Sequence, residues 1–165
     1  PEDRHKHGLV LDYSLENNMV LQRYWQPQFQ HNGFIKADEV RKYSDHLIEQ
    51  YDVRSGQGSV TIARSMSGGN QQKVVIAKWI GMHPSIIIMD EPTRGIDVGA
   101  KRDIYDLMNE LTAQGVAIIM VSSDLPEVIG MSDRILVVHE GKIAGEIPHE
   151  QATQENIITL ATGGI

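Results

Sequence analysis

Residues 86–92 read Ile-Ile-Ile-Met-Asp-Glu-Pro. A continuous aliphatic run of this kind is typical of a strand in a parallel sheet that is covered on both faces. Its carboxyl end carries Asp90 and Glu91, and open α/β sheets bind their ligands at that end of the strands. There Asp90 can hold Mg²⁺, directly or through water, and Glu91 can polarise a water molecule that attacks a phosphoryl group. The alternative is that the two acids cap a helix beginning at Pro92.

A second segment, residues 67–73, reads Ser-Gly-Gly-Asn-Gln-Gln-Lys and opens a predicted helix. The two glycines let a ligand approach the backbone closely. The N–H groups and the positive dipole end of the helix favour an anion such as phosphate, and the Ser67 hydroxyl can add a donor. A serine-capped helix after a glycine turn explains the same residues without a ligand.

A third segment, residues 93–101, is a glycine-containing loop in which Asp97 precedes a predicted helix. An acid at this position can belong to a functional loop. Taken alone, it is equally well explained as the N-cap of the helix.

The pattern around these segments predicts an α/β fold. Helices are predicted at residues 15–24, 36–51, 71–81, 100–113, 126–130 and 151–161, and strands at residues 86–89, 116–121, 134–139 and 142–147. Aliphatic strands that alternate with helices indicate a parallel sheet with helices on both faces. Glu140-Gly141 lies between the last two strands and predicts a tight turn, so these strands should form an antiparallel hairpin.

The composition indicates one globular domain. The 165 residues carry 15 Lys and Arg against 22 Asp and Glu, and the net charge of −7 disfavours broad binding to nucleic acid. The chain has no cysteine, which excludes disulfides, thiolate zinc sites and cysteine nucleophiles. No apolar run approaches the ~20 residues of a membrane-spanning helix.

In this order and spacing, the three segments resemble the signature motif, the Walker B strand with its catalytic glutamate, and the D-loop of ATP-binding-cassette (ABC) ATPases. Together with residues 1–4, Pro-Glu-Asp-Arg, they look like the second cassette of the tandem ATPases that energise bacterial uptake of ribose, xylose and galactosides. Nucleoside-uptake relatives share these motifs. Residues 1–22 are closer to the nucleoside type and residues 93–165 to the ribose type, so both substrate classes stay open.

The fold class that this resemblance implies is a partial ABC nucleotide-binding domain. The Walker A loop, G-x-x-x-x-G-K-[ST], is absent, because the only Gly-Lys pair is Gly141-Lys142. Glu2 stands at the Q-loop position, where Gln is more usual, so we expect the chain to begin inside the domain. Residues 1–81 should hold the Q-loop remnant and the helical signature subdomain. Residues 82–165 should hold the Walker B and D-loop half of a RecA-like P-loop NTPase core, with a C-terminal hairpin and helix.

The resemblance also places Ser123 where the family has its switch histidine. Serine cannot supply the imidazole's hydrogen bond to the γ-phosphate or carry a proton at neutral pH. ABC sites form between two cassettes, so the resemblance implies that this chain acts chiefly in trans, on ATP held by a partner cassette, with Asp97 near the interface. The residues implied to meet that nucleotide are Ser67, Gly68, Gly69, Asn70, Gln71 and Gln72.

The implied parent protein is the ATPase subunit of a sugar or nucleoside importer, with ATP and Mg²⁺ as cofactors, Glu91 as the catalytic residue and Asp90 holding Mg²⁺ via water. Its expected partners are a second cassette in the same polypeptide, two permease subunits that dock near residues 11–25 and, indirectly, a binding protein. Nucleic acid is not an expected partner. We expect a cytoplasmic location, peripheral on the inner face of the cell membrane.

Two alternatives stay open. The first is a non-catalytic interaction module that binds no nucleotide; without a Walker A loop, we expect the isolated chain to be inactive. The second is an ABC ATPase of the chromosome-maintenance and DNA-repair branch, which shares the Ser-Gly-Gly signature. That branch predicts long heptad repeats and a basic surface, and the sequence shows neither.

Overall fold

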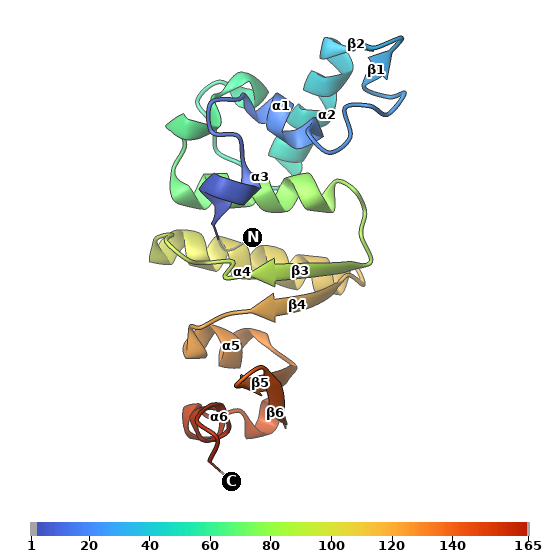
Figure 1. Ribbon diagram of the computed structural model, residues 1–165. Helices are drawn as coiled ribbons and strands as arrows, with labels where there is room; N and C mark the ends of the chain where they lie inside the picture. Colours follow the sequence, from blue (N-terminus) through green and yellow to red (C-terminus); the bar gives the residue numbers. More distant parts are fainter. Residues whose placement is uncertain (1–2, 165) are drawn as a thin grey trace. The chain divides into compact units, whose positions relative to one another are not determined.

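The computed structural model describes residues 3–164, and the chain forms two compact units, residues 1–119 and residues 120–165 (Figure 1). Pro1, Glu2 and Ile165 lie outside the described residues, so the predicted Q-loop position Glu2 lies outside them too. The first unit contains η1 (Arg4–Gly8), α1 (Leu15–Val20), β1 (Gln30–His31), β2 (Phe34–Ile35), α2 (Ala37–Gln50), η2 (Gly58–Val60), η3 (Ala63–Ser65), α3 (Gly68–Ile80), β3 (Ile86–Asp90) and α4 (Val98–Ala113). β4 (Ala117–Val121) runs into the second unit, which contains α5 (Leu125–Met131), β5 (Arg134–His139), β6 (Lys142–Pro148), η4 (His149–Gln151) and α6 (Gln154–Ala161).

The helical part of the first unit is built around α1. Ser14 caps this helix, because its Oγ accepts a hydrogen bond from the Asn17 N–H at 3.3 Å. Leu15 and Met19 of α1 are almost completely buried in one core cluster with Val74 of α3. This burial of aliphatic side chains holds α3, the helix that begins at the predicted signature, against the rest of the unit.

β3 and β4 are neighbours in a two-stranded sheet, and α4 connects them along the chain. A helical crossover is the connection that parallel strands require. The pair starts where the Ala117 N–H donates to the Ser85 carbonyl at 2.9 Å.

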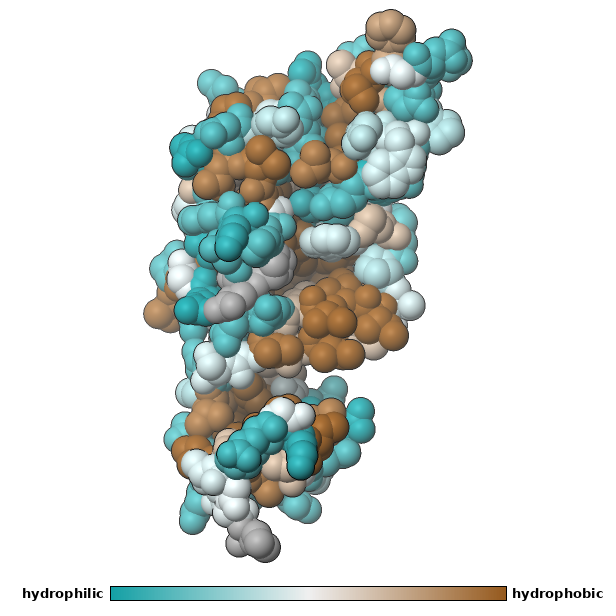
Figure 2. Space-filling view, viewed as in Figure 1, coloured by the Kyte–Doolittle hydropathy of each residue, from teal (hydrophilic) through white to brown (hydrophobic). Residues whose placement is uncertain are grey.

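The expectation that this sheet is covered on both faces is wrong for the described residues. Ile86 and Ile88 are 59% and 69% exposed, whereas Met89 is buried. Alternate side chains of a strand point to opposite faces, so one face of β3 is packed and the other is open. Figure 2 shows the open face as brown, apolar surface in the region of β3.

The second unit is a hairpin covered by a helix. β5 and β6 pair antiparallel, and the register shifts between Val137 and Val138, which leaves Ala144 as an extra residue on β6. Glu140 and Gly141 both have positive φ, 46° and 76°, as the predicted tight turn requires. α6 closes the core of this unit with Ile157.

The predicted helices and strands are largely confirmed, with differences at their ends. α1 stops at Val20, four residues before its predicted end, because the chain tightens into turns such as Arg23 N–H to Val20 carbonyl, 2.7 Å. α3 begins at Gly68, three residues earlier than predicted. The hairpin of β1 and β2 was not predicted; its turn, Asn32-Gly33, has φ values of 50° and 84°.

No helix within residues 3–164 is both long enough and apolar enough to cross a bilayer.

Candidate functional site

The N-terminus of α3 is the first part of the candidate site. Ser67 caps the helix: its Oγ accepts from the Asn70 N–H at 3.4 Å and from Asn70 Nδ2 at 3.0 Å. The capping interpretation is therefore confirmed. It is compatible with anion binding, because the first N–H groups of a helix have no acceptor within the helix and the dipole is positive at this end. Ser67 is exposed and Gly68 half-buried, so this end is open to a ligand.

Packing requires the glycine at position 69, and a side chain at position 68 would displace the Arg4 guanidinium. A Cβ on Gly68 would lie 2.7 Å from Arg4 Nη2 and 3.4 Å from the Gly95 carbonyl oxygen. A Cβ on Gly69 would overlap the Cβ of Ala100 on α4. The sequence suggested close approach of a ligand; the structure adds close approach of two other parts of the chain.

The two glutamines of the segment face inward. Gln71 and Gln72 are 5% and 6% exposed. Gln71 Nε2 donates to the Ala63 carbonyl at 3.0 Å, and its Oε1 lies 2.9 Å from His5 Nε2. Asn70 Oδ1 accepts from the Arg54 N–H at 2.8 Å. These side chains therefore position the helix, while Ser67 at its N-cap is exposed.

The carboxylates of the Walker B segment lie where β3 ends. β3 includes Asp90, and Glu91 follows in the left-handed region with φ +48°. A non-glycine residue in this region costs about 1–3 kcal/mol, and such strain concentrates at functional sites. Pro92 and Thr93 are buried, which fixes the turn that presents Glu91.

The alternative that the two acids cap a helix starting at Pro92 is wrong. Residues 91–95 form a turn in which the Arg94 N–H donates to the Glu91 carbonyl at 3.2 Å. The next helix, α4, begins only at Val98.

Asp97 is the N-cap of α4. Its Oδ1 accepts from the Ala100 N–H at 2.9 Å, so the capping interpretation of this residue is confirmed. Asp97 is exposed, at the start of a 16-residue helix. A second helix N-terminus thus follows directly from the Walker B turn.

Arg4 connects the N-terminus of α3 to this turn. Its Nη1 donates to the Arg94 carbonyl at 3.0 Å and its Nη2 to the Gly95 carbonyl at 3.3 Å. Its Nε lies 3.5 Å from Gln71 Oε1. Sequence reasoning singled out the Pro-Glu-Asp-Arg motif but assigned no role to Arg4, since its partners are 67 to 91 residues away.

The segment that carries Arg4 is itself fixed at both ends. Asp3 caps η1, and N–H donation from Lys6, then from His5, holds the pKa of the Asp3 carboxyl below its usual value. At the other end, Lys78 Nζ donates to the Gly8 carbonyl at 2.7 Å. Burial lowers the pKa of Lys78.

Ser123 lies in the second unit, exposed in the loop between β4 and α5. Its neighbour Ser122 donates from Oγ to Glu127 Oε2 at 2.5 Å, and Asp124 caps α5 by accepting from the Glu127 N–H at 3.4 Å. The loop is thus held by hydrogen bonds on both sides of Ser123.

The donor set fits Mg²⁺ only together with a nucleotide. Within residues 3–164 no group of three or more His, Asp or Glu side chains is placed to hold a metal ion. Mg²⁺ in phosphoryl-transfer sites is commonly held by one or two carboxylates together with phosphate oxygens. Asp90 and Glu91 are suitable carboxylates for such a shared site.

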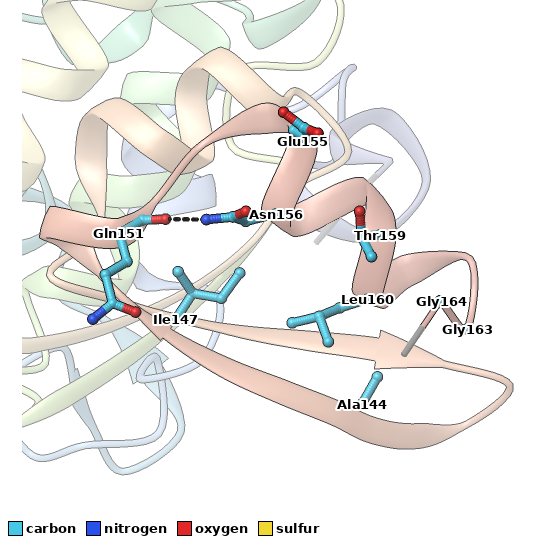
Figure 3. A pocket seen from close by; sticks show the side chains of 9 residues that line it. All are labelled: Ala144, Ile147, Gln151, Glu155, Asn156, Thr159, Leu160, Gly163 and Gly164. Carbon is cyan, nitrogen blue, oxygen red and sulfur yellow. Dashed lines mark hydrogen bonds between the residues drawn. The ribbon is translucent and has the colours of Figure 1, made fainter.

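One cavity is lined in part by residues of the motifs, and a second lies apart from them. One, of about 380 Å³, is bordered in the first unit by α3 and β3, with Trp79, Ile88 and Asp90 among its lining. The other, of about 640 Å³, lies between β6 and α6 in the second unit (Figure 3). Its lining includes Asn156, which donates to the Gln151 carbonyl at 2.9 Å, and one charged side chain, Glu155. An acid in a largely neutral lining does not favour phosphate.

Comparison with known proteins identifies the fold and the family. Ribose import ATP-binding protein RbsA of Oceanobacillus iheyensis is 55% identical over 163 residues, which is 99% of this chain and 32% of that protein; RbsA of Bacillus subtilis is 57% identical over the same shares. The chain thus spans about a third of the length of the curated relatives it matches.

Solved structures share the fold at lower identity. The dimeric ATP-binding cassette MJ0796 bound to ADP and Pi has a TM-score of 0.69 at 23% identity and covers 88% of this chain and 60% of that one. CbiO1 of Clostridium perfringens, part of the ABC transporter complex cbiONQ, has a TM-score of 0.71 at 22% identity and covers 95% of this chain and 59% of that one. The model of the ABC transporter family matches residues 4–94. The expected ABC cassette fold is confirmed, and the chain belongs to the ABC transporter family.

Proposed function

We propose that this chain is part of the ATP-hydrolysing subunit of an importer for ribose or a similar sugar. The support is its 50–57% identity to ribose import ATP-binding proteins over almost its whole length. That identity favours the sugar over the nucleoside alternative. The division into a signature half, residues 1–81, and a Walker B and D-loop half, residues 82–165, is part of the same proposal.

The signature acts, in this proposal, on a nucleotide held by a partner cassette. The observation that carries it is the open N-terminus of α3, where Ser67 is exposed and Gly68 is half-buried. Charge that develops on a transferring phosphoryl group is stabilised by N–H and hydroxyl donors that are already in place. Because the relatives are about three times longer than this chain, one polypeptide can contain both cassettes.

The residues of the Walker B turn have a separate role in the chain's own half-site. Glu91 would accept a proton from a water molecule, and the turn at Pro92 and Thr93 would hold that carboxylate in position. When bound, MgATP would supply the transferable phosphoryl group and the metal charge that neutralises it. Asp90 would bind the metal through water. In the sequence, the switch position holds Ser123, which cannot carry a proton at neutral pH, and this favours slow hydrolysis by the chain's own half-site.

The permease-facing surface is proposed for residues 11–25. Tyr24 and Trp25 are 51% and 58% exposed, and their rings meet edge to face with centroids 5.6 Å apart. Exposed aromatic pairs are common anchors at interfaces. Such an interface would place the protein on the cytoplasmic face of the membrane. Trp25→Glu should reduce copurification with the permease, and an unchanged yield would contradict this surface.

The trans role is tested with Ser67→Arg in the full-length protein that contains this chain. A large cation at the cap should block the approach of the phosphate, and ATP turnover should fall by about 10²–10³-fold. Thr112→Arg is the matched control, because it places the same side chain on an exposed hydroxyl residue near the C-terminal end of α4. Turnover near the wild-type rate in Ser67→Arg would overturn the proposal.

A further inference from the structure

Arg4 is held so that its side chain, and not its backbone, makes the connection to the Walker B turn. The backbone of η1 is closed by the Leu9 N–H, which donates to the Arg4 carbonyl at 2.9 Å. Lys78, near the end of α3, holds Gly8. The segment is therefore attached to α3, while the guanidinium reaches across to the carbonyls of Arg94 and Gly95.

α3 and α4 begin at the same end of the first unit. Gly69 faces Ala100, and Lys73 Nζ pairs with Asp103 Oδ2 at 3.0 Å. The two contacts are four residues apart on α3 and three residues apart on α4, so the helices run in the same direction. Figure 1 shows both helices starting at the same side of the unit.

The guanidinium of Arg4 lies at this shared end. A cation beside a helix N-terminus is electrostatically unfavourable, because the helix dipole is positive at that end. The dipoles of α3 and α4 therefore do not explain its presence. The carbonyls of Arg94 and Gly95 and the side chain of Gln71 are the acceptors that hold it there.

We propose that Arg4 is a positioning residue that fixes the N-terminus of α3 relative to the loop leading to Asp97. With Arg4 in place, Ser67 and Asp97 keep one spacing, and both helix N-termini meet the partner-held nucleotide together. This proposal rests on the proposed trans role of Ser67. It assigns the Pro-Glu-Asp-Arg motif a mechanical part in catalysis that requires no contact with nucleotide.

The planar guanidinium is essential to this arrangement. Five N–H donors in a rigid fork can serve two carbonyls and the Gln71 amide oxygen at once, whereas a lysine ammonium is a point donor on a flexible stem. Arg4→Lys therefore keeps the positive charge but removes the planar fork of N–H donors, and Arg4→Gln removes both the charge and the fork. If charge alone mattered, the two variants would behave differently.

The test uses the full-length protein with kcat, KM for ATP and Tm measured for Arg4→Lys and Arg4→Gln. A misplaced catalytic group can lose about 10²-fold in rate, so kcat should fall by about 10–100-fold in both variants. KM for ATP should change little, because the nucleotide is held elsewhere. Arg64→Gln is the control: it removes another arginine, one bonded at 2.7 and 3.0 Å to both carboxylate oxygens of Asp12. Its kcat should stay at the wild-type value.

A wild-type kcat in Arg4→Lys would overturn the proposal. So would a fall in kcat that is accompanied by a fall in Tm in both Arg4 variants, while kcat and Tm of Arg64→Gln stay at the wild-type values, because loss of stability would then explain the loss of rate. The Ser67→Arg variant separates the two ideas. If it abolishes turnover while both Arg4 variants remain active, only the positioning role fails. If it leaves turnover intact, the trans role itself fails, and the role of Arg4 fails with it.

Discussion

Gly69 on α3 faces Ala100 on α4 so closely that a Cβ at position 69 would overlap the Ala100 Cβ. The contact joins the helix of the signature to the helix that follows the Walker B turn. A shift of the N-terminus of α3 must therefore either shift the N-terminus of α4 with it or separate the two helices.

Gly69→Ala should lower the free energy of unfolding by about 1–3 kcal/mol, since overpacking forces backbone shifts. Removing the opposing methyl with Ala100→Gly in the same chain should recover part of the loss. Gly130→Ala is the matched control, because a Cβ there meets nothing within 4 Å. Chemical denaturation measures all three variants, and equal effects at positions 69 and 130 would contradict the contact.

Lys78 should make stability depend on pH in the alkaline range. Burial lowers the pKa of its ammonium below the usual 10.5. Between the lowered folded-state pKa and 10.5, the unfolded chain binds more protons than the folded chain, so the Lys78 contribution to stability rises with pH and levels off above 10.5.

The measurement is the free energy of unfolding of the wild type minus that of Lys78→Met, followed from about pH 7 to about pH 11. The difference should move in favour of the wild type as pH rises. A difference that is flat over this range would refute the buried, depressed ammonium.

The open face of β3 should make the isolated chain associate. Ile86 and Ile88 are exposed next to a cavity that Trp79 lines, and exposed apolar strand surface promotes pairing between chains. Sedimentation velocity of the 165-residue chain should show dimers or larger species, and Ile88→Lys should shift them towards monomer.

Val98→Lys provides the comparison, because Val98 is 84% exposed but lies at the start of α4, outside any strand. It should leave the association unchanged. A monomeric wild type, or equal effects of the two substitutions, would show that this face does not drive association.

Local sequence patterns predicted the parts of this molecule that depend on neighbours in the chain. The run at residues 86–89, the Ser67 cap and the Glu140-Gly141 turn are such parts. The hairpin at β1 and β2 was missed because two-residue strands carry no alternation, and only Asn32-Gly33 marked it. The open face of β3 was also not predictable, since an aliphatic run indicates burial whether or not the described chain supplies a cover.

The candidate functional residues also divide into those that local sequence predicts and those that depend on distant contacts. The motif order led to Ser67, Glu91 and Asp97, but the roles of Gln71 and Arg4 in holding the site together depend on residues far away in the chain. No periodicity in the sequence predicts that the Arg4 guanidinium donates a hydrogen bond to the Gly95 carbonyl.

In the proposed trans role, the phosphates that Ser67 meets are held outside this chain. Calorimetric titration of MgATP into the isolated chain tests it most directly, with circular dichroism first showing the expected helices folded. No saturable binding is expected at micromolar nucleotide. A saturable isotherm with micromolar Kd would contradict it, because the chain would then hold the nucleotide by itself.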